Sequence, residues 1–569
     1  MALLGPSFQT GRSALAAYQS ALAIVGQNIA NVGNPNYTRL SGRLTPQLGG
    51  PTLGGVAPGA GVRLSHLNRH IDESIESQLR LAIATRSGAD VRRTQLSRVE
   101  SLYNELTEQD LSTQLTQFFS SFGEVQTAPA DGAPRQGVLV AADAMVRTIR
   151  RQRSGLLTQI SDLNQLAVEG ARRAGEIARE IAQINQQVVS EEARGQSVSG
   201  PLRDRRDTLL KELADYMNVQ VREQPNGSVN VYVGSQPLVE FNRSRGLTTQ
   251  IELVDGYERA SIRFADDQSS VVLRAGKLAG IVETRDVHLV NQLDRLDGLA
   301  RGLIREVNQV HGQGRGLTGY SSMQSAHFAA NPAAPLGSTA AGLPFPVQNG
   351  TMIVHVRDPQ TGQEITRQIE IDLDGIGSND TTLETLANDL DEVPGLNAFV
   401  GSDGRLNISG ENGQQFWFTE DSSGVLSAVG IGAFFTGTDA ATIDVSADLR
   451  RDPGLIAASA SGAINDGDNA GLLAVLGDRA SGLLGGVGLH TYHSRTISEL
   501  AVSTAAALGE LDASDTVFAS LTAQRESISG VSLDEEAINL QKFERAFQGA
   551  TRYLTVLDSL ADEVLSLVR

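Results

Sequence analysis

The chain of 569 residues contains no cysteine. This absence excludes disulfide bonds, thiol catalysis and metal sites that depend on cysteine ligands. It does not locate the protein, but it leaves no thiol for an oxidising exterior to modify.

The chain also has fewer basic than acidic residues. There are 47 Lys and Arg residues against 66 Asp and Glu residues, which gives a formal net charge of −19. A phosphate backbone and an anionic membrane surface carry the same sign and would repel such a chain. We therefore expect neither nucleic acid nor a membrane among its partners.

Long apolar runs are missing as well. No segment reaches the ~18 to 20 uninterrupted apolar residues that a membrane-spanning helix needs. Residues 14–25 are mostly apolar, but Gln19 and Ser20 interrupt them and only Arg12 provides a preceding basic residue. We therefore expect a helix of the mature protein here and not a secretory signal.

Both ends of the chain carry a regular stripe of apolar residues. The spacing alternates between three and four residues, which places the stripe on one face of a helix and is typical of a coiled-coil seam. The N-terminal stripe consists of Leu4, Phe8, Gly11, Leu15, Tyr18, Leu22, Val25, Ile29 and Val32, and the C-terminal stripe of Leu540, Phe543, Phe547, Ala550, Leu554, Leu557, Ala561, Val564 and Val568. A helix with one narrow apolar stripe gains little stability alone. Each end therefore needs a partner, which is either the body of its own chain or the other end together with neighbouring subunits.

A turn rich in Asn and Pro follows the first stripe. Residues 28–31 read Asn-Ile-Ala-Asn, and Pro35 precedes residues 37–39, Tyr-Thr-Arg. This combination resembles the N-terminal signature of the bacterial flagellar axial proteins, the rod, hook and hook-associated family. Two residues depart from it: Asn34 stands where Thr is usual, and Asn36 where Gly is usual. Asn tolerates a left-handed backbone better than other non-glycine residues, so the turn can survive the second change.

The C-terminal end narrows the resemblance to the members that join hook to filament. Residues 529–540, Ser-Gly-Val-Ser-Leu-Asp-Glu-Glu-Ala-Ile-Asn-Leu, are similar to their C-terminal signature, although Phe543 and Phe547 replace the usual Tyr. Interior segments are similar to the same members and keep their order: 206–213, 226–234, 276–280, 308–312 and 434–437. From the residues alone, the three acidic side chains at 534–536 are expected to cap the first turn of the last helix, where negative charge interacts favourably with the helix dipole.

The resemblance implies a structural adaptor at the distal end of the hook, exported through the flagellar apparatus without cleavage and located outside the cell. It implies self-association into a ring or helical tube. It also implies contacts with the hook protein and the next junction protein, and a cytosolic export chaperone at the C-terminal helix. Before assembly we expect the terminal helices to lack neighbours. We place the assembly interface at Leu4, Phe8, Leu15, Tyr18, Leu22, Val25, Asn28, Ile29, Asn31, Tyr37, Leu540, Phe543, Phe547, Ala550, Leu554, Leu557 and Val564.

Two other functions stay open. Within the same family, the chain could be a hook or distal rod protein. From a different class, it could be a secreted enzyme or adhesin that uses a β-rich domain, with Trp417 as a ligand platform between Phe416 and Phe418. An alternating core strand is the competing explanation for that aromatic triplet.

Periodicity predicts an α+β multidomain fold with terminal helices forming a coiled coil. Residues 1–41 and 530–569 form this terminal domain, and residues 42–216, 284–330 and 450–529 form a body of long bundled helices. Within the body, the Gly- and Pro-rich residues 42–62 are expected to be a linker or extended loop. Alternating patterns predict a β-rich insertion at 217–283, with a hairpin turn at Asn226-Gly227, and an outer β-rich domain at 331–449.

Three short motifs suggest small-ligand chemistry and fail on context. Residues 314–319 satisfy G-x-G-x-x-G, but they follow a predicted helix, whereas a dinucleotide fingerprint follows a strand. Residues 466–468, Asp-Gly-Asp, resemble a calcium loop, but Ala470 and Gly477 occupy positions that need oxygen ligands. We expect an exit loop and a turn, respectively.

Two histidine pairs have spacings that could bind zinc. His66 and His70 are four residues apart, and His490 and His493 are three apart, but neither pair has the Glu of a metalloprotease helix and no cysteine completes a site. We expect structural histidines, no metal, no cofactor and no enzymatic activity.

Overall fold

The structure is a computed structural model that describes residues 4–47, 59–103, 110–193, 199–377 and 379–567. It divides into two compact units. Unit 1 comprises residues 1–95, 161–284 and 505–569, and unit 2 comprises residues 96–160 and 285–504. Three helices, α2 (Glu73–Tyr103), α4 (Gly132–Glu192) and α12 (Leu489–Ser529), contribute residues to both.

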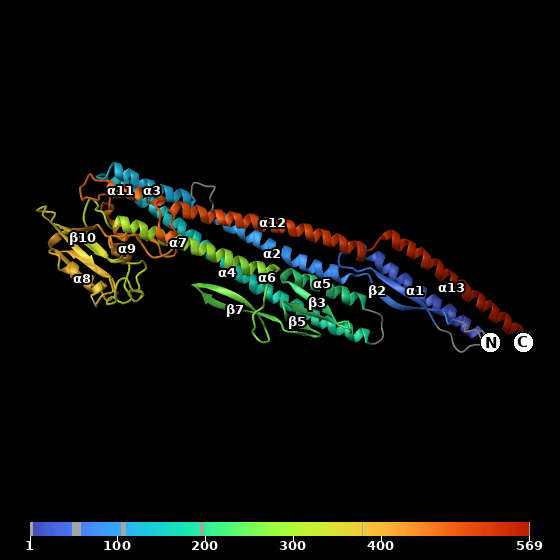
Figure 1. Ribbon diagram of the computed structural model, residues 1–569. Coiled ribbons are helices and arrows are strands. Elements are labelled where there is room, and N and C mark those ends of the chain that lie inside the picture. Colours follow the sequence, from blue (N-terminus) through green and yellow to red (C-terminus); the bar gives the residue numbers. More distant parts are fainter. Residues whose placement is uncertain (1–3, 48–58, 104–109, 194–198, 378, 568–569) are drawn as a thin grey trace. The chain divides into compact units, whose positions relative to one another are not determined.

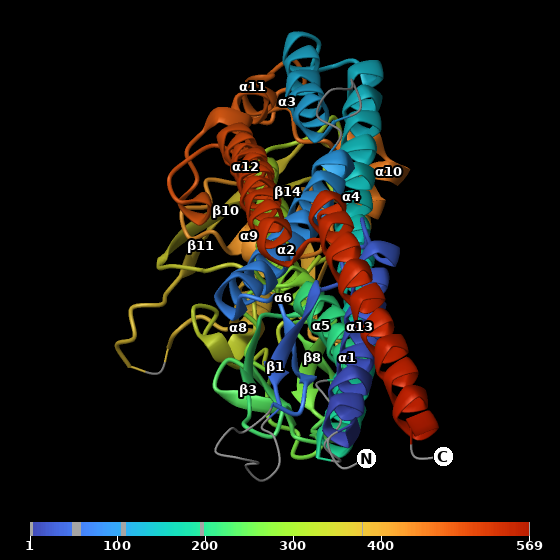
Figure 2. The same ribbon diagram turned by 90° about the vertical axis from the view of Figure 1, so that its right-hand side faces the viewer.

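Unit 1 contains both terminal helices, α1 (Leu4–Ala30) and α13 (Leu533–Leu567). The two helices lie alongside each other (Figures 1 and 2). The expectation that each lacks a neighbour within the single chain is therefore wrong: in the structure, each terminal helix has the other. Of the predicted stripes, the side chain of Leu4 and the whole of Val568 lie outside the described residues.

A β-hairpin packs on α1 as well. Strands β1 (Leu40–Pro46) and β2 (Val62–Arg69) pair antiparallel, with Leu40 opposite Arg69 and Pro46 opposite Val62. The prediction of a linker over 42–62 is wrong for its first residues, which form a strand, and residues 48–58 lie outside the described part. The pairing has a register shift between Arg43 and Leu44, and the side chains of Leu44, Leu64 and Leu67 are half-buried on strands that contact α1.

The remaining part of unit 1 combines helices with two small sheets. The helices are α5 (Gly200–Tyr216) and α6 (Lys277–Glu283) together with part of α4. One sheet has the order β3-β4-β5-β6, and the other pairs β7 with β8. Their strands are β3 (Val219–Glu223), β4 (Val229–Val233), β5 (Gln236–Glu240), β6 (Arg243–Ser244), β7 (Leu247–Val254) and β8 (Tyr257–Phe264). The predicted hairpin turn lies between β3 and β4, and Gly227 has the positive φ of +82° that such a turn requires.

Unit 2 is built around an aromatic core. Phe118 of α3 (Leu111–Thr127) and Phe434 and Phe435 pack with ring centroids 4.8 to 5.6 Å apart. The π-helical turn Thr284–Leu289 leads into α7 (Val290–His311) beside this core. Apolar residues recur with the 3.6-residue helical period at 289–310 and at 160–188, and these two stripes are buried, mostly in α7 and in α4, as expected for the predicted helical body.

The β strands of unit 2 form three small sheets. Their orders are β11-β10-β14, β12-β13-β9 and β15-β16. The strands are β9 (Ser322–Gln324), β10 (Gly350–Arg357), β11 (Glu364–Ile371), β12 (Leu396–Val400), β13 (Leu406–Gly410), β14 (Gln415–Thr419), β15 (Phe435–Thr436) and β16 (Asp444–Val445). The short helices are α8 (Leu383–Asp391), α9 (Val425–Val429), α10 (Ala447–Arg451) and α11 (Asp468–Ala474). The boundary drawn at residue 330 separates β9 from β13, with which it pairs.

The aromatic triplet on β14 belongs to the core. Phe416, Trp417 and Phe418 are all buried, because β14 is covered on both faces. The Trp417 ring stacks on His355 at 5.0 Å, and the Arg315 guanidinium lies 4.3 Å from its centroid. Trp417 is therefore a core residue and not an exposed ligand platform. The predicted α+β multidomain fold class is confirmed.

Candidate functional site: the joint of the terminal helices

The residues of the Asn-Ile-Ala-Asn signature meet the C-terminal signature at the root of the two terminal helices. We call this region, residues 28–40 with 525–536, the terminal joint. Its centre is Asn28, which is 1% exposed at the end of α1. The Asn28 Oδ1 atom accepts from the Tyr37 hydroxyl at 2.8 Å and from the Leu40 amide at 3.1 Å. Its Nδ2 donates to the Leu40 carbonyl at 2.9 Å and to Glu536 at 3.1 Å.

All four hydrogen-bonding positions of the Asn28 amide are thus used. An aspartate would lose the two donors, and a leucine would leave Tyr37 and Glu536 with buried unpaired groups. The geometry supplies a physical reason for asparagine at this position.

The turn after α1 is held by its own backbone. The Tyr37 amide donates to the Asn34 carbonyl, and the Asn36 amide donates to the Asn34 side chain, each at 3.1 Å. Asn34 therefore makes an Asx turn in the place where the family usually has Thr. Asn36 is not among the described non-glycine residues with positive φ, whereas Gly33 has a φ of +77°. The left-handed residue of this turn is Gly33, so the turn accommodates Asn36 without a left-handed backbone at that position.

Arg39 connects the turn to the start of α13. Its Nη1 lies 2.6 Å from Glu535, and its Nε donates to Glu536 at 2.9 Å. Its backbone amide also donates to the carbonyl of Ser529, the last residue of α12. Glu536 is 1% exposed, so it is a buried ion-pair partner as well as a residue of the first turn. The sequence predicted only the capping role of these carboxylates.

A second arginine ties α12 to the same turn. Arg525, 6% exposed, donates to the Pro35 carbonyl at 2.7 Å and to Glu76 of α2 at 2.6 Å. Lys211 of α5 lies 3.1 Å from the other Glu76 oxygen. Burial opposes ionisation of Glu76, but Lys211 and Arg525 outweigh it and lower the pKa of this carboxyl.

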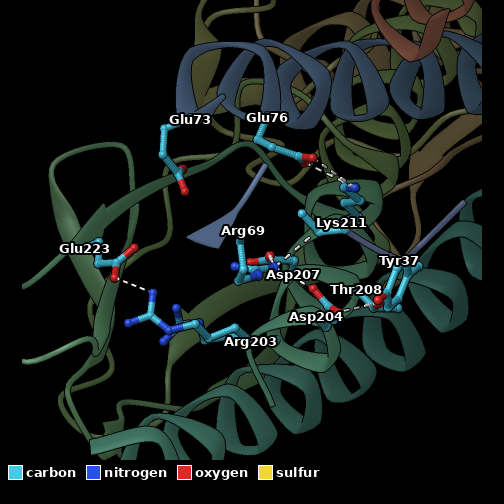
Figure 3. A network of polar contacts seen from close by, with 12 residues as sticks. Tyr37, Arg69, Glu73, Glu76, Arg203, Asp204, Asp207, Thr208, Lys211 and Glu223 are labelled. Carbon is cyan, nitrogen blue, oxygen red and sulfur yellow. Dashed lines mark hydrogen bonds and ion pairs between the residues drawn. The ribbon is translucent and has the colours of Figure 1, made fainter. Parts of the chain in front are cut away.

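A third cluster lies beside Tyr37 (Figure 3). Arg69 is the last residue of β2, and its guanidinium contacts Asp204 and Asp207 of α5, each at 2.6 Å. Burial, opposed by Arg69, raises the pKa of Asp204. Burial, with smaller contributions from Asp204 and Glu536, raises the pKa of the Tyr37 phenol to about 12.

The sequence did not point to Arg69, Glu76, Lys211 or Arg525. Only residues 206–213 carried a signal, as one of the segments that resemble the family. These polar residues are far apart in sequence and come together only in the fold, so the spacing of residues along the chain cannot predict their contacts.

The structure places most of the predicted stripe residues on the contact between α1 and α13. Val25, Ala550 and Leu557 are buried, and the partly buried positions are Phe8, Leu15, Tyr18, Leu22, Ile29, Phe543, Phe547 and Leu554. At Gly11, an added Cβ atom would lie 2.5 Å from Leu554 Cδ2, so this glycine leaves room for the leucine. Val32, Leu540 and Val564 are exposed, and Asn31 is half-buried. Ala17 and Ala21 are buried, although the stripe did not include them.

A second set of apolar side chains on α13 stays exposed. Tyr553, Val556, Leu560 and Val564 are 43%, 56%, 45% and 38% exposed, and their spacing of three and four residues forms a stripe. It borders the α1 contact at Tyr553, which lies near Gly11, and shares Val564 with the predicted stripe. A continuous apolar stripe of this kind on a helix surface is typical of an interaction site.

The short motifs proved structural. Residues 314–319 form a loop after α7 in which Arg315 is paired with Ser459, and they do not open a helix. Asp466 accepts from the Ser461 amide and hydroxyl and from the Asp468 amide, and these bonds lower the pKa of its carboxyl despite partial burial. The predicted exit loop at 314–319 is confirmed, whereas the predicted turn at 466–468 is wrong at its last residue, because Asp468 begins α11.

The histidine pairs lie in different surroundings. His66 lies on β2, and the His70 ring, just beyond β2, hydrogen-bonds Ser41 at 2.9 Å. His490 packs against Phe119 at 5.7 Å, and His493 is buried, both on α12. Within the described residues, the one acidic or histidine group close enough to share a metal is Asp372, Asp374 and Asp380, on a loop after β11.

None of the helices in the described part of the chain offers an apolar segment long enough to span a membrane.

Comparisons with known proteins agree with this geometry. A family model described as the helical domain of the flagellar hook-associated protein FlgK matches residues 96–325. This segment of the chain is thus similar to a domain of the flagellar axial proteins. Flagellar hook-associated protein 1 of Escherichia coli (strain K12) is 25% identical, with 98% of each chain covered.

Other relatives carry the same name. Hook-associated protein 1 of Salmonella typhimurium (strain LT2) is 25% identical, with 98% of each chain covered. The protein of Bacillus subtilis (strain 168) is 24% identical, covering 98% of this chain and 97% of its own. A solved structure, the flagellar hook junction protein FlgK from Burkholderia pseudomallei, matches with a TM-score of 0.50 at 15% identity, over 80% of this chain and all of the other, which supports the fold. The predicted resemblance to hook-associated protein 1 is confirmed.

Proposed function

We propose that this chain is a structural adaptor of the bacterial flagellum that assembles at the distal end of the hook and connects hook to filament. The proposal has support from near-full-length similarity to four proteins named hook-associated protein 1. It assigns no catalytic role. It places the protein outside the cell, after export, at the junction between the two tubes.

The observation that carries the assembly mechanism is the terminal joint with its exposed stripe. The joint fixes α1 against α13 through Asn28, Arg39 and Glu536. The stripe of Tyr553, Val556, Leu560 and Val564 is then presented on a helix that already has one partner. Burying such side chains yields roughly 1.5 to 3 kcal/mol each before entropy is subtracted, which favours subunit association.

In this arrangement one surface of α13 contacts α1 and another contacts neighbouring subunits. The predicted residues Phe543, Ala550, Leu554 and Leu557 hold the helix pair together within a subunit. The exposed stripe makes contacts between neighbouring copies in a ring or tube, and with hook protein on one side and the next junction protein on the other. The same stripe is where an export chaperone would bind before assembly.

The test is a double substitution, Val556→Asp with Leu560→Asp, in the full-length protein. We expect a folded monomer that fails to assemble on isolated hooks and fails to restore motility in cells lacking the protein. The matched control is Thr551→Asp with Thr555→Asp, which adds the same charge at exposed positions of α13 outside the stripe. Normal assembly of the stripe variant, or equal failure of the control, would contradict the mechanism.

A further inference from the structure

Unit 2 contains a cleft of about 1160 Å³. One wall is the three-stranded sheet of β9, β12 and β13, and the other is made by residues 430–451. Ligand sites for small molecules range from about 300 to 1,000 Å³, so the cleft has room for more than one ring of a ligand.

The register of the sheet determines which side chains face the cleft. Phe399 lies opposite Asn407, and Asn407 lies opposite Gln324. All three line the cleft and are exposed or half-buried, and the neighbouring pair, Ile408 and Met323, also lines the cleft but is buried. One cross-strand row therefore presents a phenyl ring followed by two amides, of which the Gln324 nitrogen already donates to Asp403 at 3.2 Å.

The next row continues this chemistry. Ser409 lies opposite Ser322, and both line the cleft. The Asn407 amide nitrogen donates to the Arg405 carbonyl at 3.2 Å, whereas its oxygen and the two serine hydroxyls have no hydrogen-bond partner among the described residues. These groups can both accept and donate to a ligand.

Two phenylalanines on the cleft are exposed. Phe399 and Phe328 are each 55% exposed, although a phenyl ring gains free energy from leaving water. Each ring offers a flat apolar face next to polar groups.

The charges that line the cleft are already paired. Arg405 donates to the Ser325 and Ala326 carbonyls and lies 3.8 Å from Asp403, and Arg451 contacts Asp448 at 3.3 Å. A charged ligand would find no partner here without disrupting one of these pairs. The observations favour an uncharged ligand that combines an apolar face with many hydroxyl groups.

We propose that this cleft binds a neutral saccharide, with Phe399 stacking on the C–H face of a pyranose ring and Asn407, Gln324 and Ser409 bonding its hydroxyls. A pyranose matches the row because its ring presents carbon-bound hydrogens on one face and hydroxyls around its edge. Phe328 provides a second stacking face for a neighbouring sugar. This binding is independent of assembly through the terminal helices.

The experiment titrates the full-length protein with maltotriose, mannotriose and lactose, using saturation-transfer NMR and calorimetry. We expect at least one of them to bind, Phe399→Ala and Asn407→Ala to weaken its binding at least tenfold, and Phe399→Tyr to retain it. The control Leu253→Ala removes a side chain that is 75% exposed on β7 of unit 1 and should leave binding unchanged. Fluorescence of Trp417 checks that each variant of unit 2 is folded.

Three outcomes would overturn the proposal. The first is that none of the three sugars binds. The second is that Phe399→Ala and Asn407→Ala bind as the unchanged protein does, which places any sugar elsewhere. The third is that these variants lose self-association while sugar binding is absent, which makes the surface a protein interface.

Discussion

Neutralising Glu536 tests the terminal joint directly. Glu536→Gln keeps the shape of the side chain but removes the charge that Arg39 contacts at 2.9 Å and that Asn28 contacts at 3.1 Å. Removing one partner of a buried ion pair costs about 3 to 5 kcal/mol. The Arg39 side chain is 21% exposed and keeps Glu535, so we expect a smaller loss of about 2 to 3 kcal/mol in the stability of unit 1.

The matched control changes Glu535, the other carboxylate that contacts the Arg39 guanidinium. The Glu535 side chain is 60% exposed and also contacts Arg39. An exposed pair of this kind is worth about 0 to 1 kcal/mol. Glu535→Gln removes the same charge from the neighbouring position, so a difference between the two variants reports burial and not net charge.

The assay is urea-induced unfolding of the full-length protein. Circular dichroism reports the helices of both units, and Trp417, the single tryptophan, reports unit 2. We expect Glu536→Gln to shift the part of the circular dichroism transition that belongs to unit 1 and to leave the Trp417 transition in place. A shift no larger than that of Glu535→Gln, or an equal shift of both signals, would refute the account of the joint.

Three further predictions concern the same unit. Because the pKa of Tyr37 is raised in the folded state, its contribution to stability is present below the ordinary value of 10 and is lost as pH rises toward about 12; Tyr37→Phe should flatten the alkaline part of a stability-against-pH curve. Gly26→Ala should stabilise α1 by about 0.5 to 1 kcal/mol, because nothing lies within 4 Å of the added Cβ atom. Gly11→Ala must displace Leu554, so it should gain less or lose stability. Amide hydrogen exchange of α1 measures both effects. Arg525→Lys cannot reach both Pro35 and Glu76, and it should lower the urea midpoint of unit 1; an unchanged midpoint would mean that the bidentate geometry does not matter.

The spacing of apolar residues predicted the helices, because the apolar face of each helix is the face that becomes buried. The stripes of α4 and α7 are buried where their spacing indicated, since one apolar face can pack only one way. The prediction for residues 42–62 was wrong at their start because the Gly and Pro residues suggested a linker, while the register shift in the hairpin leaves no regular alternation of apolar residues to indicate a strand.

The candidate site was predicted in part. Asn28 and Tyr37 were found through the resemblance, but the hydrogen bond of Asn28 to Glu536 and the electrostatic effect of Asp204 on Tyr37 join residues that no local pattern relates. Glu536 was assigned a capping role because it lies in a first turn, and only the fold places Arg39 beside it.

The joint also has a consequence for the order of folding. Asn28 and Glu536 are separated by 508 positions in the chain. Contacts of such long sequence separation close a very large loop, so we expect them to form late. A chain that emerges N-terminus first carries α1 without its partner until α13 is free. Completion of the helix pair therefore follows the release of α13.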